Sequence, residues 1–105
     1  MKDMTKRIPV RSKAIRKAAE GEACTVCGRN DGTTVFCHLN ESWAGKGMGQ
    51  KADDLGAGFF GCNHCHMGFD GHLDGNYKID WRDVAIAIYR TTRRLYEKGI
   101  ITIKP

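Results

Sequence analysis

The sequence predicts a small α+β fold, and three observations lead to this prediction. Two Cys-x-x-Cys pairs, Cys24–Cys27 and Cys62–Cys65, are separated by 34 residues. Between them lie two short runs rich in β-branched or aromatic residues, 33–38 and Phe59–Phe60. A helical stretch begins near Cys65. Since Zn²⁺ takes four ligands in a tetrahedron and each pair supplies two thiolates, we expect two strands and a helix stapled by zinc.

The chain has 105 residues, and this length predicts a single domain over 1–105. We divide it into a basic N-terminal arm and helix over 1–22, a zinc-stapled core over 23–75, and a C-terminal amphipathic helix with a short strand over 76–105. A core of this size is marginal alone. Structural zinc should therefore contribute materially to folding.

The net charge and the number of cysteines indicate the kind of partner and the cellular compartment of the protein. The net charge is +5 and the pI is near 9.1, which suits a polyanionic partner. Five cysteines are an odd number, which argues against a closed disulfide scaffold and favours a reducing compartment. The charged N-terminus and the lack of a long apolar run predict a cytoplasmic protein without a membrane partner.

The N-terminal region predicts a short basic helix. Ser12 is a typical N-cap, the helix is expected over Lys13–Glu20, and Gly21 should end it. Its expected apolar side consists of Ala14, Ile15, Ala18 and Ala19. Arg16 and Lys17 are candidates for contact with nucleic-acid phosphates, while a solvated, frayed N-terminus is an equally open interpretation.

The middle of the chain predicts the elements of the core. The run 33–38 should form a strand that ends at His38, and Phe59–Phe60 a second strand. The intervening glycine-rich loop carries Lys46 and Lys51, which suits a backbone that lies close to phosphate. In a helix that starts near Cys65, His66 and Asp70 are an i, i+4 pair whose side chains can share one small cation.

The C-terminal region predicts a supporting helix. Asp80 is its expected N-cap, Trp81 its first residue, and Gly99 should stop it after about Lys98. Its expected apolar side consists of Trp81, Val84, Ala85, Ile88 and Leu95. The run Ile100–Ile103 predicts a short terminal strand whose edge pairs within the fold or with a second chain, so the oligomeric state stays open.

The order of these motifs resembles the HNH endonucleases, which are also called ββα-metal or His-Me finger nucleases. The motifs are Cys37-His38-Leu39-Asn40, Gly45-Lys46-Gly47, Lys51-Ala52-x-Asp54, Cys62-x-x-Cys65-His66 and Phe69-Asp70-Gly71. More narrowly, the region from about 12 to 75 looks like the small nuclease-like proteins of phage and prophage recombination regions. This resemblance implies a phage- or prophage-encoded protein of the bacterial cytoplasm, with DNA and a recombination protein as partners.

The resemblance also implies roles for individual residues. His38 would be the general base that activates water. His66 and Asp70 would hold a catalytic divalent cation, separate from the structural zinc, and an Asp oxygen in that position should favour Mg²⁺ or Mn²⁺. Phosphodiester hydrolysis needs an activated water and positive charge on the phosphate, and a neutral imidazole and a divalent cation provide these.

Two positions depart from the family pattern. Cys37 stands where many relatives have an acidic residue or a second histidine, and it reads as a small, half-buried apolar residue. The middle Asn of the HNH name, which orients the base, has no Asn match here. Asp54 is the candidate for that role, with Asp53 and Asn40 as the next choices.

Simpler interpretations remain open for these residues. His38 can be a hydrogen-bonded residue at a strand end. His66 can be a zinc ligand that replaces a cysteine, or a residue of the N-terminal turn of a helix without a role in the site. Asp70 can be a turn residue before Gly71, with His72 taking its place as a ligand.

Three other functions compete with the nuclease. A non-catalytic, zinc-containing nucleic-acid-binding module would keep both cysteine pairs and the basic arm. A zinc deaminase would have Pro before Cys62 and a Glu two residues after His38, but the chain has Gly61 and Asn40. A redox role for the Cys-x-x-Cys pairs lacks the expected βαβ setting.

Overall fold

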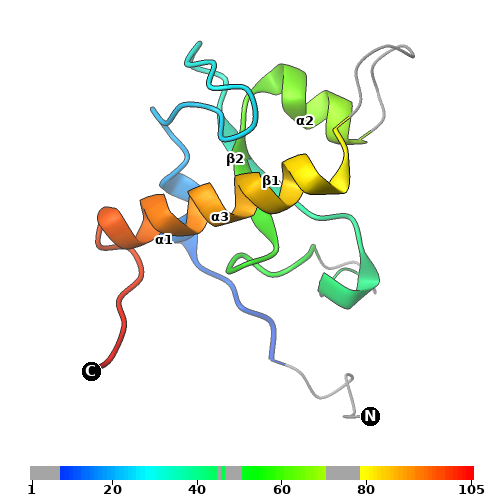
Figure 1. The fold of residues 1–105 in the computed structure, drawn as a ribbon. Coiled ribbons are helices and arrows are strands. Elements are labelled where there is room, and N and C mark those ends of the chain that lie inside the picture. Colours follow the sequence, from blue (N-terminus) through cyan, green and yellow to red (C-terminus); the bar gives the residue numbers. More distant parts are fainter. Residues whose placement is uncertain (1–7, 45, 47–50, 71–78) are drawn as a thin grey trace.

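The computed structural model describes residues 8–44, 46, 51–70 and 79–105 and shows a small α+β fold (Figure 1). Its elements in chain order are α1 (Lys13–Lys17), β1 (Val35–His38), the 3₁₀ helix η2 (Ser42–Ala44), β2 (Gly58–Gly61), α2 (Asn63–Asp70) and α3 (Trp81–Glu97). The long helix α3 crosses the strands and packs on β2, whereas α1 packs on β1. His72 and the predicted loop glycines Gly45, Gly47 and Gly49 lie outside the described residues.

The two strands pair antiparallel, and the pairing places His38 opposite Gly58. A Cβ atom at Gly58 would lie 2.5 Å from the Phe36 ring and 2.7 Å from the Cys37 carbonyl oxygen. A side chain at this position would therefore push the strands apart where His38 is presented. The requirement for glycine here comes from this close approach.

The first strand begins at Val35, two residues later than the sequence predicts. Thr33 is withdrawn from the strand because its backbone N–H and its hydroxyl both donate to Asp31 Oδ1, at 3.0 and 2.6 Å. This local turn competes with strand pairing. The predicted end of the strand at His38 and the second strand at Phe59–Phe60 are confirmed.

Helix α1 is shorter than predicted. The Ser12 hydroxyl accepts the Ile15 N–H at 3.2 Å, which confirms the N-cap. The helix ends at Lys17 rather than Glu20, and the chain continues through turns to Gly21, whose φ is +80°. Ile15, Ala18 and Ala19 are buried as expected, but Ala14 is exposed, so its assignment to the apolar side was wrong.

Helix α2 follows β2 directly and completes the predicted order of strand, strand and helix. It begins at Asn63, two residues before the predicted start, because the Asn63 N–H is held by the Thr33 hydroxyl at 2.9 Å. The His66 N–H donates to the Cys62 carbonyl at 2.8 Å. The second cysteine pair therefore forms the first turn of the helix that carries His66 and Asp70.

Helix α3 has the predicted boundaries but a rotated buried face. Asp80 accepts the Asp83 N–H at 2.9 Å, and the helix ends before Lys98 and Gly99, as predicted. Its buried residues are Val84, Ala87, Thr91 and Leu95. Trp81 and Ala85, which were expected on this face, are exposed. Ala85 lies off the stripe that spacings of three and four residues from Val84 define, whereas Trp81 lies on this stripe but at the exposed N-terminal end of the helix.

The predicted terminal strand over Ile100–Ile103 is wrong, because these residues are not in a strand. The N–H groups of Ile100 and Ile101 both donate to the Leu95 carbonyl, at 2.9 and 3.3 Å. They satisfy the carbonyl that the end of α3 leaves without a helical partner. The segment therefore caps the C-terminal end of α3, and Ile100 and Ile101 pack against the buried cluster that contains Phe60.

Two fully buried phenylalanines organise the core on β2. Phe59 packs in a cluster that includes Val84 and Ala87, and Phe60 packs with Ile15 and Leu95. Neighbouring residues of a strand point to opposite faces, so β2 connects α3 with α1. Within the described residues, no helix has the length and apolarity that crossing a bilayer requires.

Candidate active site and metal centre

Four cysteines form a cluster that can hold zinc. The Sγ atoms of Cys24, Cys27, Cys62 and Cys65 all lie within 4.8 Å of one another, and those of Cys27 and Cys62 are 3.7 Å apart. A tetrahedral ion with Zn–S bonds of about 2.3 Å would separate its sulfur atoms by about 3.8 Å. The spacing of the thiols therefore fits a structural zinc ion.

The backbone around the first pair favours thiolates. The N–H groups of Val26 and Arg29 approach the Sγ atoms of Cys24 and Cys27, each at 3.4 Å. Burial by itself would raise the pKa of the Cys24 thiol, but backbone N–H groups lower it to about 7. Burial raises the pKa of the Cys62 thiol. A bound cation would be needed to hold all four groups as thiolates.

The fifth cysteine lies outside this cluster. Cys37 is 1% exposed on β1, and its Sγ lies 3.9 Å from the Gly61 carbonyl oxygen. The sequence predicted a half-buried small residue, and the structure buries it fully.

His38 and Asp54 form a hydrogen-bonded pair in the candidate active site. His38 Nε2 and Asp54 Oδ1 are 2.7 Å apart, and the Asp54 side chain is fully buried. A carboxylate only accepts hydrogen bonds, so the Nε2 atom carries the hydrogen of this pair. The neutral ring then has its lone pair on Nδ1, which is the atom that can accept a proton.

The surroundings of Asp54 keep it ionised. Burial alone would raise the pKa of this carboxyl group. The hydrogen bond from His38, the hydrogen bond from the Ser12 N–H at 2.6 Å and the positive charge of Arg16 lower it. Together they outweigh burial, so the pKa of Asp54 lies below its ordinary value. Arg16 Nε lies 3.2 Å from Asp54 Oδ2, and an Arg11 guanidinium nitrogen lies 3.7 Å from Oδ1. Asp54 is therefore a charged acceptor at neutral pH.

The segment before α1 holds the loop that carries Asp54. The Asp54 N–H donates to the Val10 carbonyl at 2.8 Å, and the Arg11 guanidinium donates to the carbonyls of Lys51 and Ala52. These bonds join residues about 40 positions apart in the chain. Part of the basic N-terminal region therefore serves as a brace for the site.

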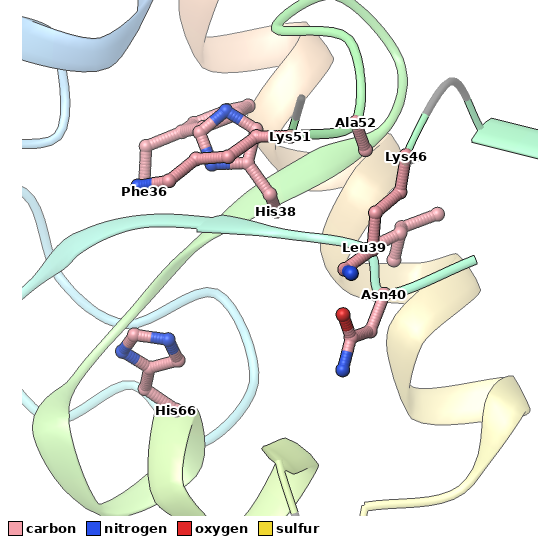
Figure 2. A pocket seen from close by; sticks show the side chains of 8 residues that line it. All are labelled: Phe36, His38, Leu39, Asn40, Lys46, Lys51, Ala52 and His66. Atoms are coloured by element: carbon pink, nitrogen blue, oxygen red, sulfur yellow. The ribbon is translucent and has the colours of Figure 1, made fainter. Parts of the chain in front are cut away.

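An open cavity of about 300 Å³ lies beside His38 (Figure 2). Its lining consists of Phe36, His38, Leu39, Asn40, Lys46, Lys51, Ala52 and His66. Figure 2 shows that His66 comes from the helix α2, whereas His38 comes from the strand β1. The cavity thus brings together two imidazoles and two ammonium groups, a combination that suits an anionic phosphodiester.

The remaining predicted site residues are distributed as follows. Asp70 is the last residue of α2, one turn after His66, and its side chain lies outside what the structure describes. Asn40 lines the cavity, and Asp53 Oδ1 lies 3.4 Å from the Val10 N–H. Lys17 is exposed at the end of α1.

Sequence reasoning missed the residues that surround Asp54. Arg11 was given no role beyond the basic charge of the N-terminal arm, and Arg16 was a candidate for phosphate contact rather than for contact with a carboxylate 38 positions away. The Ser12 cap was recognised, but its N–H bond to Asp54 was not. No local pattern encodes these contacts, and the conspicuous basic charge of the segment was the sole sequence signal.

One comparison with known proteins identifies a family for this chain. The model of one protein family, described as Putative nuclease YbcO, matches residues 13–100. Searches of curated proteins and of solved structures found no match. The matched region includes both cysteine pairs, both strands, α2 and α3. The chain therefore belongs to the YbcO family of putative nucleases.

Proposed function

We propose that the protein is a metal-dependent HNH endonuclease that hydrolyses DNA phosphodiester bonds. The observation that carries this proposal is the hydrogen bond of 2.7 Å between His38 Nε2 and the buried Asp54 carboxylate, beside a cavity that His66 also lines. Membership of a nuclease family supports it. We also propose that the protein is encoded by a phage or prophage and acts with a recombination protein. Both proposals rest on the motif resemblance.

In this proposal His38 is the general base. Asp54 fixes the hydrogen on Nε2, so that Nδ1 takes a proton from a water molecule in the cavity. That water attacks the phosphorus in line with the leaving 3′ oxygen. Asp54 thus fills the orienting position that the middle Asn has in the family pattern.

His66 and Asp70 would hold the catalytic cation. The His66 ring lines the cavity that His38 lines, and Asp70 follows one helical turn later on α2. The carboxylate oxygen of Asp70 is the ligand in this pair that favours Mg²⁺ or Mn²⁺. When bound, such an ion supplies positive charge to the phosphate and the leaving oxygen.

The basic side chains hold the substrate backbone. Lys46 and Lys51 line the cavity, where their ammonium groups can meet the phosphates that flank the cut. Lys17 adds an exposed positive charge at the end of α1. Arg16, which forms an ion pair with Asp54, can also contact an approaching phosphate.

The test is nicking of supercoiled plasmid by the zinc-loaded full chain, with and without added Mg²⁺ or Mn²⁺. We expect His38→Ala and Asp70→Ala to lower the nicking rate by about 10²- to 10⁴-fold, because each removes a group that acts on the reacting atoms. The matched controls are His64→Ala on α2 and Asp83→Ala on α3. Both should nick at the rate of the parent.

Each result of this experiment is informative. Equal nicking by the parent and by His38→Ala would overturn the assignment of the base. DNA binding without nicking by any variant would overturn the enzyme and favour the zinc-containing binding module. Zinc content and circular dichroism, measured on the same samples, identify variants that have lost their fold.

A further inference from the structure

The two tryptophans of the chain lie side by side on its surface. Trp43 belongs to η2 and is 62% exposed, and Trp81 starts α3 and is 53% exposed. Their ring centroids are 6.1 Å apart and their ring planes are tilted by 48°, so the pair forms an angled surface on which a base stacks against one ring and contacts the other. Adjacent exposed tryptophans, brought together from positions 38 residues apart, are the kind of apolar patch that marks a binding surface. We call this pair the tryptophan platform.

The platform is anchored in the core. The Trp81 ring meets Phe69 edge to face at 6.1 Å, and Phe69 meets Phe59 edge to face at 5.6 Å. Phe59 is fully buried on β2. This ladder of rings holds the platform in place before any ligand arrives, so that little conformational freedom would be lost on binding.

The platform lies near the candidate active site. Trp43 is three residues from Asn40 and three from Lys46, and both of these residues line the cavity of His38. Three residues span at most about 11 Å. Phe69, under the platform, is on the helix that carries His66. A nucleotide that follows a phosphate bound in the cavity can therefore reach the platform.

The charges around the tryptophan platform indicate which part of a nucleotide can bind there. Asp80 and Asp83 flank Trp81 and outnumber the neighbouring Arg82, so this surface does not attract phosphate. The ammonium groups of Lys46 and Lys51 are at the cavity instead. The backbone is thus held at the cavity, and the platform is left for the uncharged face of a base.

We propose that Trp43 and Trp81 stack an unpaired nucleobase next to the scissile phosphate. Bases within a duplex are stacked on each other and present only their edges to a protein, whereas an unpaired base exposes its flat face. The preferred substrate is therefore DNA with unpaired nucleotides beside the cut. This inference rests on the proposed nuclease function and specifies its substrate.

Intrinsic fluorescence tests the proposal directly, because both tryptophans of the chain are in the platform. Zinc-loaded protein without added Mg²⁺ or Mn²⁺ is titrated with a short oligothymidylate and with a duplex of equal length. Fluorescence quenching reports stacking, and anisotropy of labelled DNA reports affinity. We expect quenching by the single strand and little quenching by the duplex.

Variants of Trp43 separate stacking from general binding. Trp43→Leu should weaken single-strand binding by about 5- to 100-fold and leave duplex binding unchanged, because base stacking contributes that much per base. Trp43→Tyr, which retains a flat ring, should recover most of the loss. Tyr89→Leu is the matched control, since Tyr89 is similarly exposed at 66% on α3, and it should bind like the parent.

The outcomes distinguish this inference from the proposed function. Full single-strand affinity in Trp43→Leu, with plasmid nicking by the parent intact, would overturn the platform and leave the nuclease standing. Equal losses for single strand and duplex would overturn the preference for unpaired bases. Binding of neither DNA, together with no nicking by the parent, would overturn both.

Discussion

The carboxylate of Asp54 joins three parts of the chain at one point. It accepts the hydrogen of His38 from the end of β1 and the N–H of Ser12 from the start of α1, and it pairs with Arg16. A fully buried carboxylate is tolerated because these partners compensate for lost hydration. The same bonds that stabilise the charge also fix the orientation of the histidine ring.

Asp54→Asn tests this arrangement while preserving side-chain shape. The Ser12 N–H and the Arg16 guanidinium both approach Oδ2, so the amide oxygen should take that position and the NH2 group should face Nε2 of His38. This would move the ring hydrogen to Nδ1 and block the proposed base. We expect nicking to fall by at least about 10²-fold. Asp53→Asn, the matched control, should keep parental nicking. Plasmid nicking and zinc content are measured together, and undiminished activity in Asp54→Asn would show that Asp54 does not orient the base.

At the scale of elements, the outer edge of β2 is joined to both α3 and the first cysteine pair. The Phe60 N–H donates to the Thr91 hydroxyl at 2.9 Å, and the Phe60 carbonyl accepts the N–H and the hydroxyl of Thr25 at 2.8 and 2.7 Å. The backbone groups that a two-stranded sheet leaves unpaired at Phe60 are thus satisfied by side chains and by the cysteine loop.

Thr91→Val should be destabilising even though valine has nearly the same shape. It leaves the buried Phe60 N–H without its acceptor, a loss that costs about 1–3 kcal/mol. Thr92→Val removes a hydroxyl that donates to the Ile88 carbonyl of its own helix at 2.9 Å, and we expect almost no effect. Urea unfolding of both zinc-loaded variants measures the difference. Equal stabilities would mean that the bond to Phe60 contributes nothing.

These elements also show what the sequence can and cannot predict. The caps at Ser12 and Asp80 and the stop at Gly99 were predicted correctly because capping depends on a few neighbouring residues. The buried hydroxyl of Thr91 was missed because its partner is 31 positions away. Ile100–Ile103 has strand-forming residues, yet the N–H groups of Ile100 and Ile101 donate to the Leu95 carbonyl and cap α3, which strand propensity does not predict.

The same distinction applies to the candidate site. The four-cysteine cluster and the presence of His66 and Asp70 on one helix were accessible to sequence reasoning because each depends on spacing within short segments. The contact between Trp43 and Trp81 depends on the path of the whole chain. Trp81 was expected in the core, but it is the first residue of α3 and is 53% exposed.

At the scale of the whole molecule, the cysteine cluster links elements that the core alone holds weakly. It fastens the loop after α1 to the end of β2 and to the first turn of α2. The sheet has two strands in the described residues, and an isolated pair of strands is marginally stable. Since His66 directly follows Cys65, the position of the candidate active site also depends on this cluster.

Removing zinc should therefore unfold the protein. Structural zinc contributes about 10–16 kcal/mol of apparent binding free energy in small peptides, which equals or exceeds the whole stability of a typical domain. Cys27→Ser should bind zinc weakly and lose its helical circular dichroism, whereas Cys37→Ala, which removes the cysteine outside the cluster, should keep its zinc. Metal analysis and thermal melts with and without a strong chelator test this. A chelated parent that retains its spectrum and melting temperature would show that the hydrophobic core suffices without metal.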